Sequence, residues 1–90
     1  MKKAIITVVG KDTVGIIAAV CSYLAENNVN ILDISQTIVR DYFNMMMIAD
    51  LSGASKEFEA LNDELVSIGE STGVIVKMQL EDIFDSMHRI

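Results

Sequence analysis

The sequence predicts an α+β fold of the ferredoxin-like kind, a βαββαβ sandwich in which a four-stranded antiparallel sheet carries two helices on one face. The first observation behind this prediction is the length, since 90 residues, of which 51% are hydrophobic, suffice for one small domain. The second is the hydrophobic period, which changes along the chain between that of a strand and that of a helix. The third is the absence of proline and of low-complexity stretches, so no linker is visible. We therefore expect a single domain over residues 1–81 and a short helical extension over 82–90.

The first strand and the first helix occupy the beginning of the chain. Lys3–Val9 is a short run rich in β-branched residues, which is typical of a strand that is buried on both faces at the centre of a sheet. Over 14–28 the hydrophobic residues recur with a helical period, so we expect a helix with Asp12 or Thr13 as its N-cap and Asn27–Asn28 as its end. The residues that this period places on one stripe of the helix are Ile17, Val20, Cys21, Leu24 and Asn28.

Two alternating segments follow and predict a β-hairpin. In each of the segments 30–40 and 42–51, one of the two alternating sets of residues consists mostly of apolar residues. This alternation is typical of strands with one half-buried face. Only Asp41 and its neighbours separate the two segments, so we expect an antiparallel pair even though the strong Asn-Gly or Asp-Gly turn signal is absent. The residues expected to share a face are Leu32, Ile34, Gln36 and Ile38 in the first strand, and Phe43, Met45, Met47, Ala49 and Leu51 in the second.

A second helix, a fourth strand and a terminal helix complete the predicted fold. Ser52–Ser55 has the composition of a turn and a cap, and hydrophobic residues then recur at helical spacing from Phe58 up to Gly69. Gly73 precedes the fourth alternating segment. Its inward residues are expected to be Val74, Val76, Met78 and Leu80, and the terminal helix is expected to carry Ile83, Phe84, Met87 and Ile90 on one face.

This plan leaves one face of the sheet without a covering layer. The segment over 30–40 is also expected at an edge of the sheet, where unpaired backbone groups invite pairing with another chain. Counted with Gly and without Tyr, 49 of the 90 residues are apolar, about 54% against about 45–50% in ordinary globular proteins. We assign this surplus to these surfaces and to the terminal helix, so we expect a homodimer. The residues predicted to point outward on the open face are Thr7, Val9, Asp33, Ser35, Thr37, Val39, Met46, Ile48, Ile75 and Lys77.

Charge and hydropathy exclude several classes of protein. Lys and Arg number 7 against 13 Asp and Glu, which gives a net charge of −6 and disfavours binding to nucleic-acid phosphates. No run reaches the length of a membrane span, and the apolar stretch after Met1–Lys3 is too short for a signal peptide. We therefore expect a cytoplasmic protein that contacts neither membranes nor nucleic acids directly.

The side chains able to do chemistry are few and scattered. Cys21, the single cysteine, lies in the middle of a predicted helix, whereas a reactive thiolate needs a helix N-terminus or a cationic neighbour. His88, the single histidine, follows Asp85 by three residues near the chain end, which is more typical of a surface pair than of a general base. Met45–Met47 point to alternate faces of a strand and cannot converge on one metal ion. We assign no catalytic residue and no metal ligand, and we expect no enzyme activity.

The loop between the first strand and the first helix is the most informative stretch. Gly10–Gly15 reads Gly-Lys-Asp-Thr-Val-Gly, which is neither a P-loop nor a Gly-x-Gly-x-x-Gly motif. It leads into a helix N-terminus, where free N–H groups and the positive end of the helix dipole favour an anion such as a carboxylate. Glycines at both ends allow close backbone approach. The alternative interpretation is a plain turn capped by Asp12 or Thr13, and the spacing alone leaves both open.

The wider pattern around this loop resembles the ACT domain, a regulatory module of amino-acid metabolism, over residues 3–81. With Ser35–Thr37 and the segment 83–90, the chain is most similar to small stand-alone bacterial ACT proteins of undefined function. It departs from the family at Thr13–Val14, where Arg-Pro is frequent, and at Asp41, where Gly is frequent. The motif residues are Gly10-x-Asp12-x-x-Gly15-Ile16, Val20, Leu24, Asn28-x-Asn30-Ile31-x-Asp33-Ile34 and Phe43-x-Met45-x-Met47.

The resemblance implies a sensor rather than an enzyme. ACT domains typically dimerise and bind an amino acid where the loop after the first strand meets the neighbouring subunit. The expected ligand is thus an amino acid or a related small carboxylate, with no cofactor, and the output is expected in a separate protein partner. The alternative is a module that has kept the fold without a ligand and docks on a metabolic enzyme or a transcription regulator. The ligand-binding residues expected are Gly10, Lys11, Asp12, Thr13, Val14, Gly15, Asn30 and Ile31.

Overall fold

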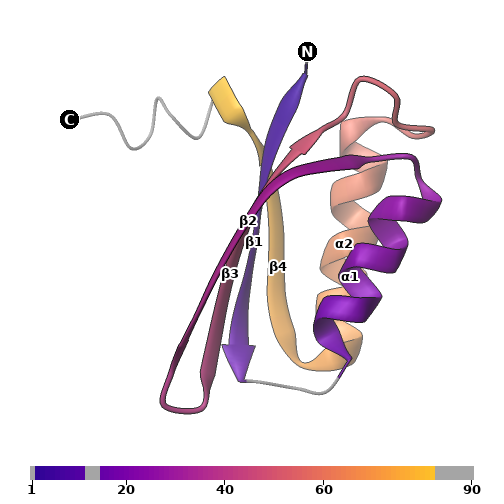
Figure 1. Ribbon diagram of the computed structural model, residues 1–90. Coiled ribbons are helices and arrows are strands. Elements are labelled where there is room, and N and C mark those ends of the chain that lie inside the picture. The colour runs from indigo at the N-terminus through magenta and orange to yellow at the C-terminus, as the bar shows by residue number, and fades with distance from the viewer. Residues whose placement is uncertain (1, 12–14, 83–90) are drawn as a thin grey trace.

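The computed structural model describes residues 2–11 and 15–82, which form a four-stranded sheet with two helices packed on one face (Figure 1). The sheet order is β2-β3-β1-β4, and every neighbouring pair is antiparallel. The predicted α+β, βαββαβ fold is therefore confirmed. The elements are β1 (Lys3–Lys11), α1 (Ile16–Glu26), β2 (Asn30–Val39), β3 (Tyr42–Asp50), α2 (Phe58–Thr72) and β4 (Val74–Leu80).

The hydrophobic core lies between the sheet and the two helices. The alternation predicted for β3 and β4 is confirmed, because their inward side chains up to Met78 are buried, and Leu80 packs against the core while partly exposed. β1 differs from its prediction, because only its helix-facing side is wholly buried and Val9 on the other side is 44% exposed. The largest fully buried side chains are Phe43, Ile6, Ile16, Leu24, Met45, Met47, Leu61, Leu65, Val8 and Val20.

α1 begins one residue after Gly15, which is its N-cap, and no side chain of residues 2–11 or 15–82 makes a cap hydrogen bond there. The expected cap residues, Asp12 and Thr13, lie outside the described residues. The buried side of the helix carries Ile16 with Val20 and Leu24, so the predicted stripe was wrong at both ends. At its end Asn28 is exposed, and Asn27 is buried instead. Ile17 is 38% exposed and Cys21 is only half-buried. The predicted end is confirmed, since Asn27 caps the helix.

α2 runs through Gly69 and ends at Gly73, which has a φ of +78°. Gly69 was expected to mark the end of this helix, and that prediction was wrong. The structure shows why a glycine stands there, because a Cβ on Gly69 would lie 2.7 Å from the carbonyl oxygen of Val74 and 2.9 Å from Cγ2 of Val76. Gly69 therefore permits the close approach of α2 to β4.

β2 is exposed on both of its faces, apart from the half-buried Ile31. One half-buried face was predicted, so this prediction was wrong. The hairpin of β2 and β3 projects beyond the helices (Figure 1), and the register of the pair shifts between Ile31 and Asp33. Ile34 and Ile38 face the helical side, because they pair with Met47 and Phe43, yet they remain 43% and 54% exposed. The edge position predicted for this strand is confirmed.

The described part of the chain contains no helix that is long and apolar enough to span a membrane. The terminal helix expected over 82–90 falls almost entirely on residues 83–90, which lie outside the described residues. It stays a prediction.

Candidate functional site

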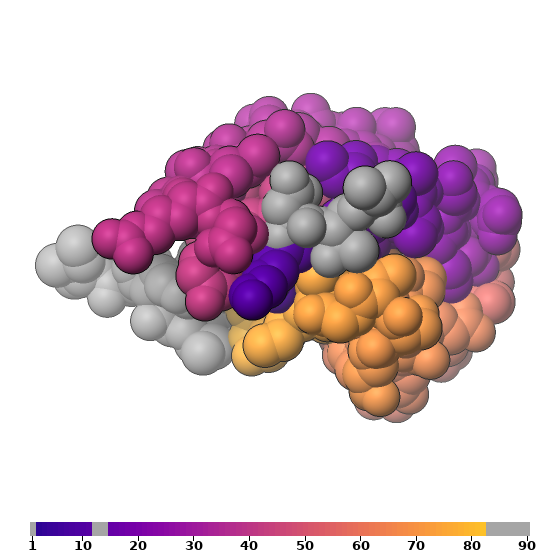
Figure 2. Space-filling view, turned by 90° about the horizontal axis from the view of Figure 1, so that it is seen from below, coloured from indigo at the N-terminus to yellow at the C-terminus, as the bar shows by residue number. Residues whose placement is uncertain are grey.

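The loop end of the molecule is formed by the last residues of β1 and the first turn of α1. In Figure 2, which views the molecule from below, the end of β1 lies between the β2–β3 hairpin and the turn from α2 into β4. Of the predicted ligand-binding residues, the structure places Gly10, Lys11 and Gly15 here. Asp12, Thr13 and Val14 lie outside the described residues, and their role stays a prediction.

Gly10 allows β1 and β4 to approach each other closely. A Cβ at this position would lie 2.8 Å from Cγ1 and 3.0 Å from Cβ of Val74, the residue opposite it on β4. Contacts this short do not occur between real side chains, so β1 and β4 can pair at their end only because residue 10 is a glycine. This packing is a second reason for a glycine at position 10, beside the ligand access to the backbone that the sequence suggests, which stays a prediction.

Gly15 precedes α1 with a backbone conformation that favours glycine. Its φ of +89° lies in the left-handed region, and a Cβ there would meet no atom within 4 Å. No side chain caps the helix and its first turn holds no acidic residue, so the first N–H groups of α1 make no side-chain cap bond with the described residues. These N–H groups and the helix dipole favour an anion at this end.

Asn30 and Ile31 lie at the opposite end of the sheet from the loop. Asn30 pairs with Asp50, and Asp50 pairs with Lys3, so Asn30 is level with the beginning of β1. Lys11, by contrast, is level with Tyr42 at the hairpin end. The eight steps along β1 from Lys3 to Lys11 correspond to about 26 Å. The two halves of the predicted site therefore do not meet within one chain.

The free side of β2 is an apolar edge, which we call the β2 edge and define by Ile17, Ile34, Ile38 and the outer backbone of β2. All three side chains are exposed, by 38%, 43% and 54%. α1 is the helix that contacts β2, whereas α2 contacts β4, so Ile17 belongs to the helix that flanks this edge. The N–H of Ile34 donates to Oδ1 of Asp33, 2.8 Å away. An edge strand beside exposed isoleucines is nevertheless suited to pair with another chain.

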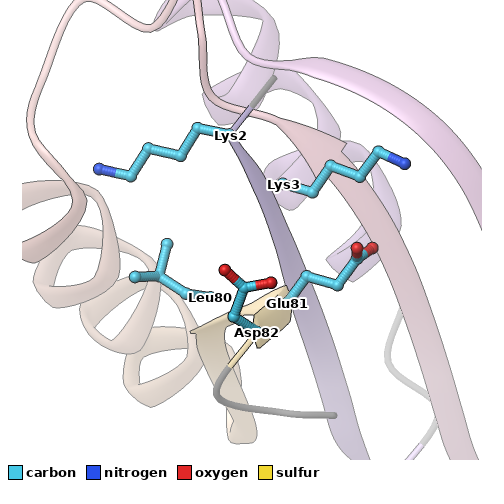
Figure 3. Close-up of a pocket in the computed structure, with 5 residues that line it drawn as sticks. All are labelled: Lys2, Lys3, Leu80, Glu81 and Asp82. Carbon is cyan, nitrogen blue, oxygen red and sulfur yellow. The ribbon is translucent and has the colours of Figure 1, made fainter.

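A broad hollow of about 670 Å³ lies at the other end of the molecule, between the beginning of β1 and the end of β4 (Figure 3). Sequence reasoning missed it, because only the pairing of β1 with β4 brings the two chain ends together. Lys2 and Lys3 extend to opposite sides, and Glu81 and Asp82 add carboxylates. Leu80 completes the lining. Its charged side chains carry both signs and do not converge on one point, so the hollow indicates no particular ligand.

A polar cluster on the helices has a structural explanation. The hydroxyl of Tyr23 on α1 donates to Oε1 of Glu64 on α2, and Nζ of Lys56 lies 2.7 Å from the same oxygen. Lys56 and then Tyr23 lower the pKa of Glu64, whereas burial, followed by the contact with Glu64, raises the pKa of Tyr23 above its usual range. The cluster ties α1 to α2. Among the described residues no group of His, Cys, Asp and Glu could hold a metal ion.

Replacing Glu64 with glutamine should destabilise the protein near neutral pH but not in acid. Because the folded-state pKa of Glu64 is lowered, its stabilising effect is complete above the unfolded-state pKa of about 4.3. That effect is lost as the pH falls through the lower folded-state pKa. Urea unfolding of both proteins at several pH values measures the difference, with Glu70→Gln on the same helix as the control. A difference that persisted in strong acid would contradict the ionic origin of the contact.

Comparison with known proteins identifies the family. A model of the ACT domain matches residues 2–79. A UPF0237 protein from Bifidobacterium longum is 60% identical over 90 residues, which cover 100% of both chains. The structure of an ACT domain protein from Streptococcus pneumoniae is similar with a TM-score of 0.81 and 42% identity, over 97% of this chain and 98% of that chain.

The fold also occurs as part of a larger protein. The regulatory subunit of aspartate kinase from Thermus thermophilus is similar with a TM-score of 0.65 and 20% identity, over 87% of this chain and 50% of that chain. At this identity the similarity concerns the fold alone. The family match spans most of the sequence, and the relative from Bifidobacterium matches it from end to end. This chain therefore belongs to the ACT domain family.

Proposed function

We propose that this protein is a non-catalytic regulatory module that binds an amino acid or a related small carboxylate as a homodimer and signals through a separate protein. The observation that carries the proposal is the start of α1 behind Gly15, where none of the described side chains caps the helix and the first turn holds no acidic residue. Membership of the ACT family supports it, as does the occurrence of the same fold in a regulatory subunit. A carboxylate is the chemical group that this helix end favours.

Two copies are needed because the predicted site is divided between the ends of the sheet. If two chains pair antiparallel along the β2 edge, the beginning of one β2 comes level with Val39 at the end of the other. Val39 pairs with Tyr42, and Tyr42 pairs with Lys11. Asn30 of the partner subunit then lies three strand spacings, or about 14 Å, from the end of β1, compared with about 26 Å within one chain. The ligand would occupy this space.

The ligand is held by complementary charge in this proposal. Backbone N–H groups from Lys11 to Gly15 donate to the ligand carboxylate, and both Asp12 and the side-chain carbonyl of the partner's Asn30 accept from its ammonium group. Charge-assisted hydrogen bonds of this kind are stronger than neutral ones, and a partly dry interface strengthens them further. A ligand that touches both chains stabilises only the dimer geometry that it fits, so it shifts that geometry. A partner protein that binds only one dimer geometry would therefore bind more or less strongly when the ligand is present.

A thermal-shift screen of the twenty amino acids, with the oligomeric state measured in parallel, tests the proposal. We expect at least one of them, at a concentration of about 100 times its Kd, to stabilise the dimer by about 2.7 kcal/mol. For a domain of this size that corresponds to a rise in Tm of about 10 °C or more. If no amino acid raises the Tm at millimolar concentration, sensing is contradicted, and a module that docks without a ligand becomes the better explanation.

A further inference from the structure

The two edge strands of the sheet differ in what lies beside them. β2 is exposed along residues 34–39, and none of these residues carries a charge. β4, at the other edge of the sheet, packs beside α2 and carries the exposed Lys77 at its middle. A covering helix and a charged side chain are both ways in which proteins keep an edge strand from pairing. The two edges are therefore not equivalent.

α2 meets the outer backbone of β4 at two places. At the first, a Cβ on Gly69 would lie 2.7 Å from the carbonyl oxygen of Val74 and 3.1 Å from the backbone nitrogen of Val76. At the second, the N–H of Met78 donates to Oδ1 of Asn62 on α2, 3.0 Å away. This N–H therefore points away from β1. Alternate residues of a strand direct their backbone groups to the same edge, so Val74, Val76 and Met78 all present their outer groups to α2.

The spacing of the two contacts is the same along the helix and along the strand. Asn62 and Gly69 lie seven residues apart, which is about two helical turns, so they share one side of α2. This separation amounts to about 10 Å along the helix axis. The strand covers a similar distance, about 10 Å, from the middle of 74–76 to Met78. α2 therefore follows the edge of β4 over this length.

We propose that Asn62 closes the β4 edge to pairing, so that a second copy of this chain can extend the sheet at β2 alone. A sheet with two open edges can add a copy at each of them and grow without closing. A sheet with one open edge is complete once two copies have paired there. The choice of β2 rests on the homodimer proposed above, whereas the closure of β4 rests on the contacts of α2.

The alternative is that the bond from Met78 to Asn62 only ties α2 to β4. Removal of the side-chain amide would then lower the stability of the fold and leave the number of chains in the assembly unchanged. Closure of the edge makes a different prediction, because a strand N–H that loses its partner becomes available to another chain. The size of the assembly therefore separates the two roles of Asn62.

Asn62→Ala in the full-length chain tests the inference. We expect sedimentation to show species of about twice the wild-type mass or more as the concentration rises toward about 1 mM, the range of a weak contact. The wild type should keep one mass over the same range. In dilute solution the Met78 amide of the variant should exchange its hydrogen up to about tenfold faster than in the wild type, through the lost hydrogen bond. As the larger species forms, NMR should show that this exchange slows again.

Two further variants serve as controls. Asn62→Asp keeps an acceptor for the N–H of Met78, and Asn44→Ala removes an exposed amide from β3, which has a strand on both sides, so both should keep the wild-type mass. The inference is overturned if Asn62→Ala keeps that mass up to about 1 mM, if Asn62→Asp associates equally, or if Met78 stays open to exchange in the larger species. A wild type of one chain would contradict the proposed homodimer, whereas the difference between variant and wild type still decides whether β4 is closed.

Discussion

Gly69→Ala should lower the free energy of unfolding by about 1–2 kcal/mol, although alanine is the better helix former. The intrinsic helix preference favours alanine over glycine by about 1 kcal/mol. Against this, the new Cβ would lie 2.7 Å from the carbonyl oxygen of Val74 and 3.1 Å from the backbone nitrogen of Val76. Backbone atoms cannot rotate away, so α2 must move off β4, and overpacking of this kind costs about 1–3 kcal/mol or more.

Ser67→Ala is the control for this prediction, because Ser67 is exposed on the same helix. It should change stability by no more than about 0.5 kcal/mol. Urea unfolding of the three proteins gives both values. If Gly69→Ala were as stable as the wild type or more stable, the close approach of α2 to β4 would not be the reason for a glycine at this position.

Asp12→Ala should remove the stabilisation by the amino acid that the screen identifies, without unfolding the protein. In the proposed site the carboxylate of Asp12 accepts from the ligand ammonium group, and the loss of a charge-assisted hydrogen bond costs about 1.5–3 kcal/mol of binding energy. The Kd should therefore rise by about 10-fold to 150-fold. Isothermal titration of the full-length protein measures it, and the Tm without ligand reports the fold.

Asp41→Ala is the matched control, since Asp41 is an exposed aspartate in the hairpin turn near the same end of the molecule. Its removal changes the charge by the same amount and should leave the Kd within about twofold of the wild type. Equal losses for Asp12→Ala and Asp41→Ala would mean that net charge, rather than a direct contact, attracts the ligand.

The order of the elements could be predicted from the sequence, because the period of the hydrophobic residues is set by local geometry. The inward residues of β3 and β4 follow from simple alternation. The burial of β2 could not be predicted this way, because it depends on how far the helices extend over the sheet. Ile34 and Ile38 have the pattern of a half-buried face, yet the helices leave them exposed.

Glycines were the second source of error, because one residue type serves several purposes. Gly69 was interpreted as the end of a helix and proved to be a place of close packing, whereas Gly73 ends the helix with a positive φ. Gly10 also lies against Val74, a close contact that its place in the loop does not reveal, and its role toward a ligand stays a prediction. The role of each glycine depends on which atoms lie near it in the folded chain, and a single sequence does not show these neighbours.

The candidate site was predictable in part. The loop before α1 could be found because a strand, a short loop and a helix N-terminus follow one another along the chain. Asn30 and Ile31 came from the family resemblance, and only the register of β1, β3 and β2 shows that they lie at the other end of the sheet. That register explains in physical terms why the site that the family resemblance implies would need a neighbouring subunit.

Mixing two defective variants tests the shared site most directly. In homodimers of Asp12→Ala, and equally of Asn30→Ala, each site lacks one of its two contributions, so both proteins should bind the identified amino acid weakly. A mixed dimer contains one site with both natural residues, because each site takes its loop from one chain and Asn30 from the other. Titration of a refolded equimolar mixture should therefore recover tight binding at about a quarter of the sites. A mixture that binds no better than its separate components would contradict a site shared between two chains.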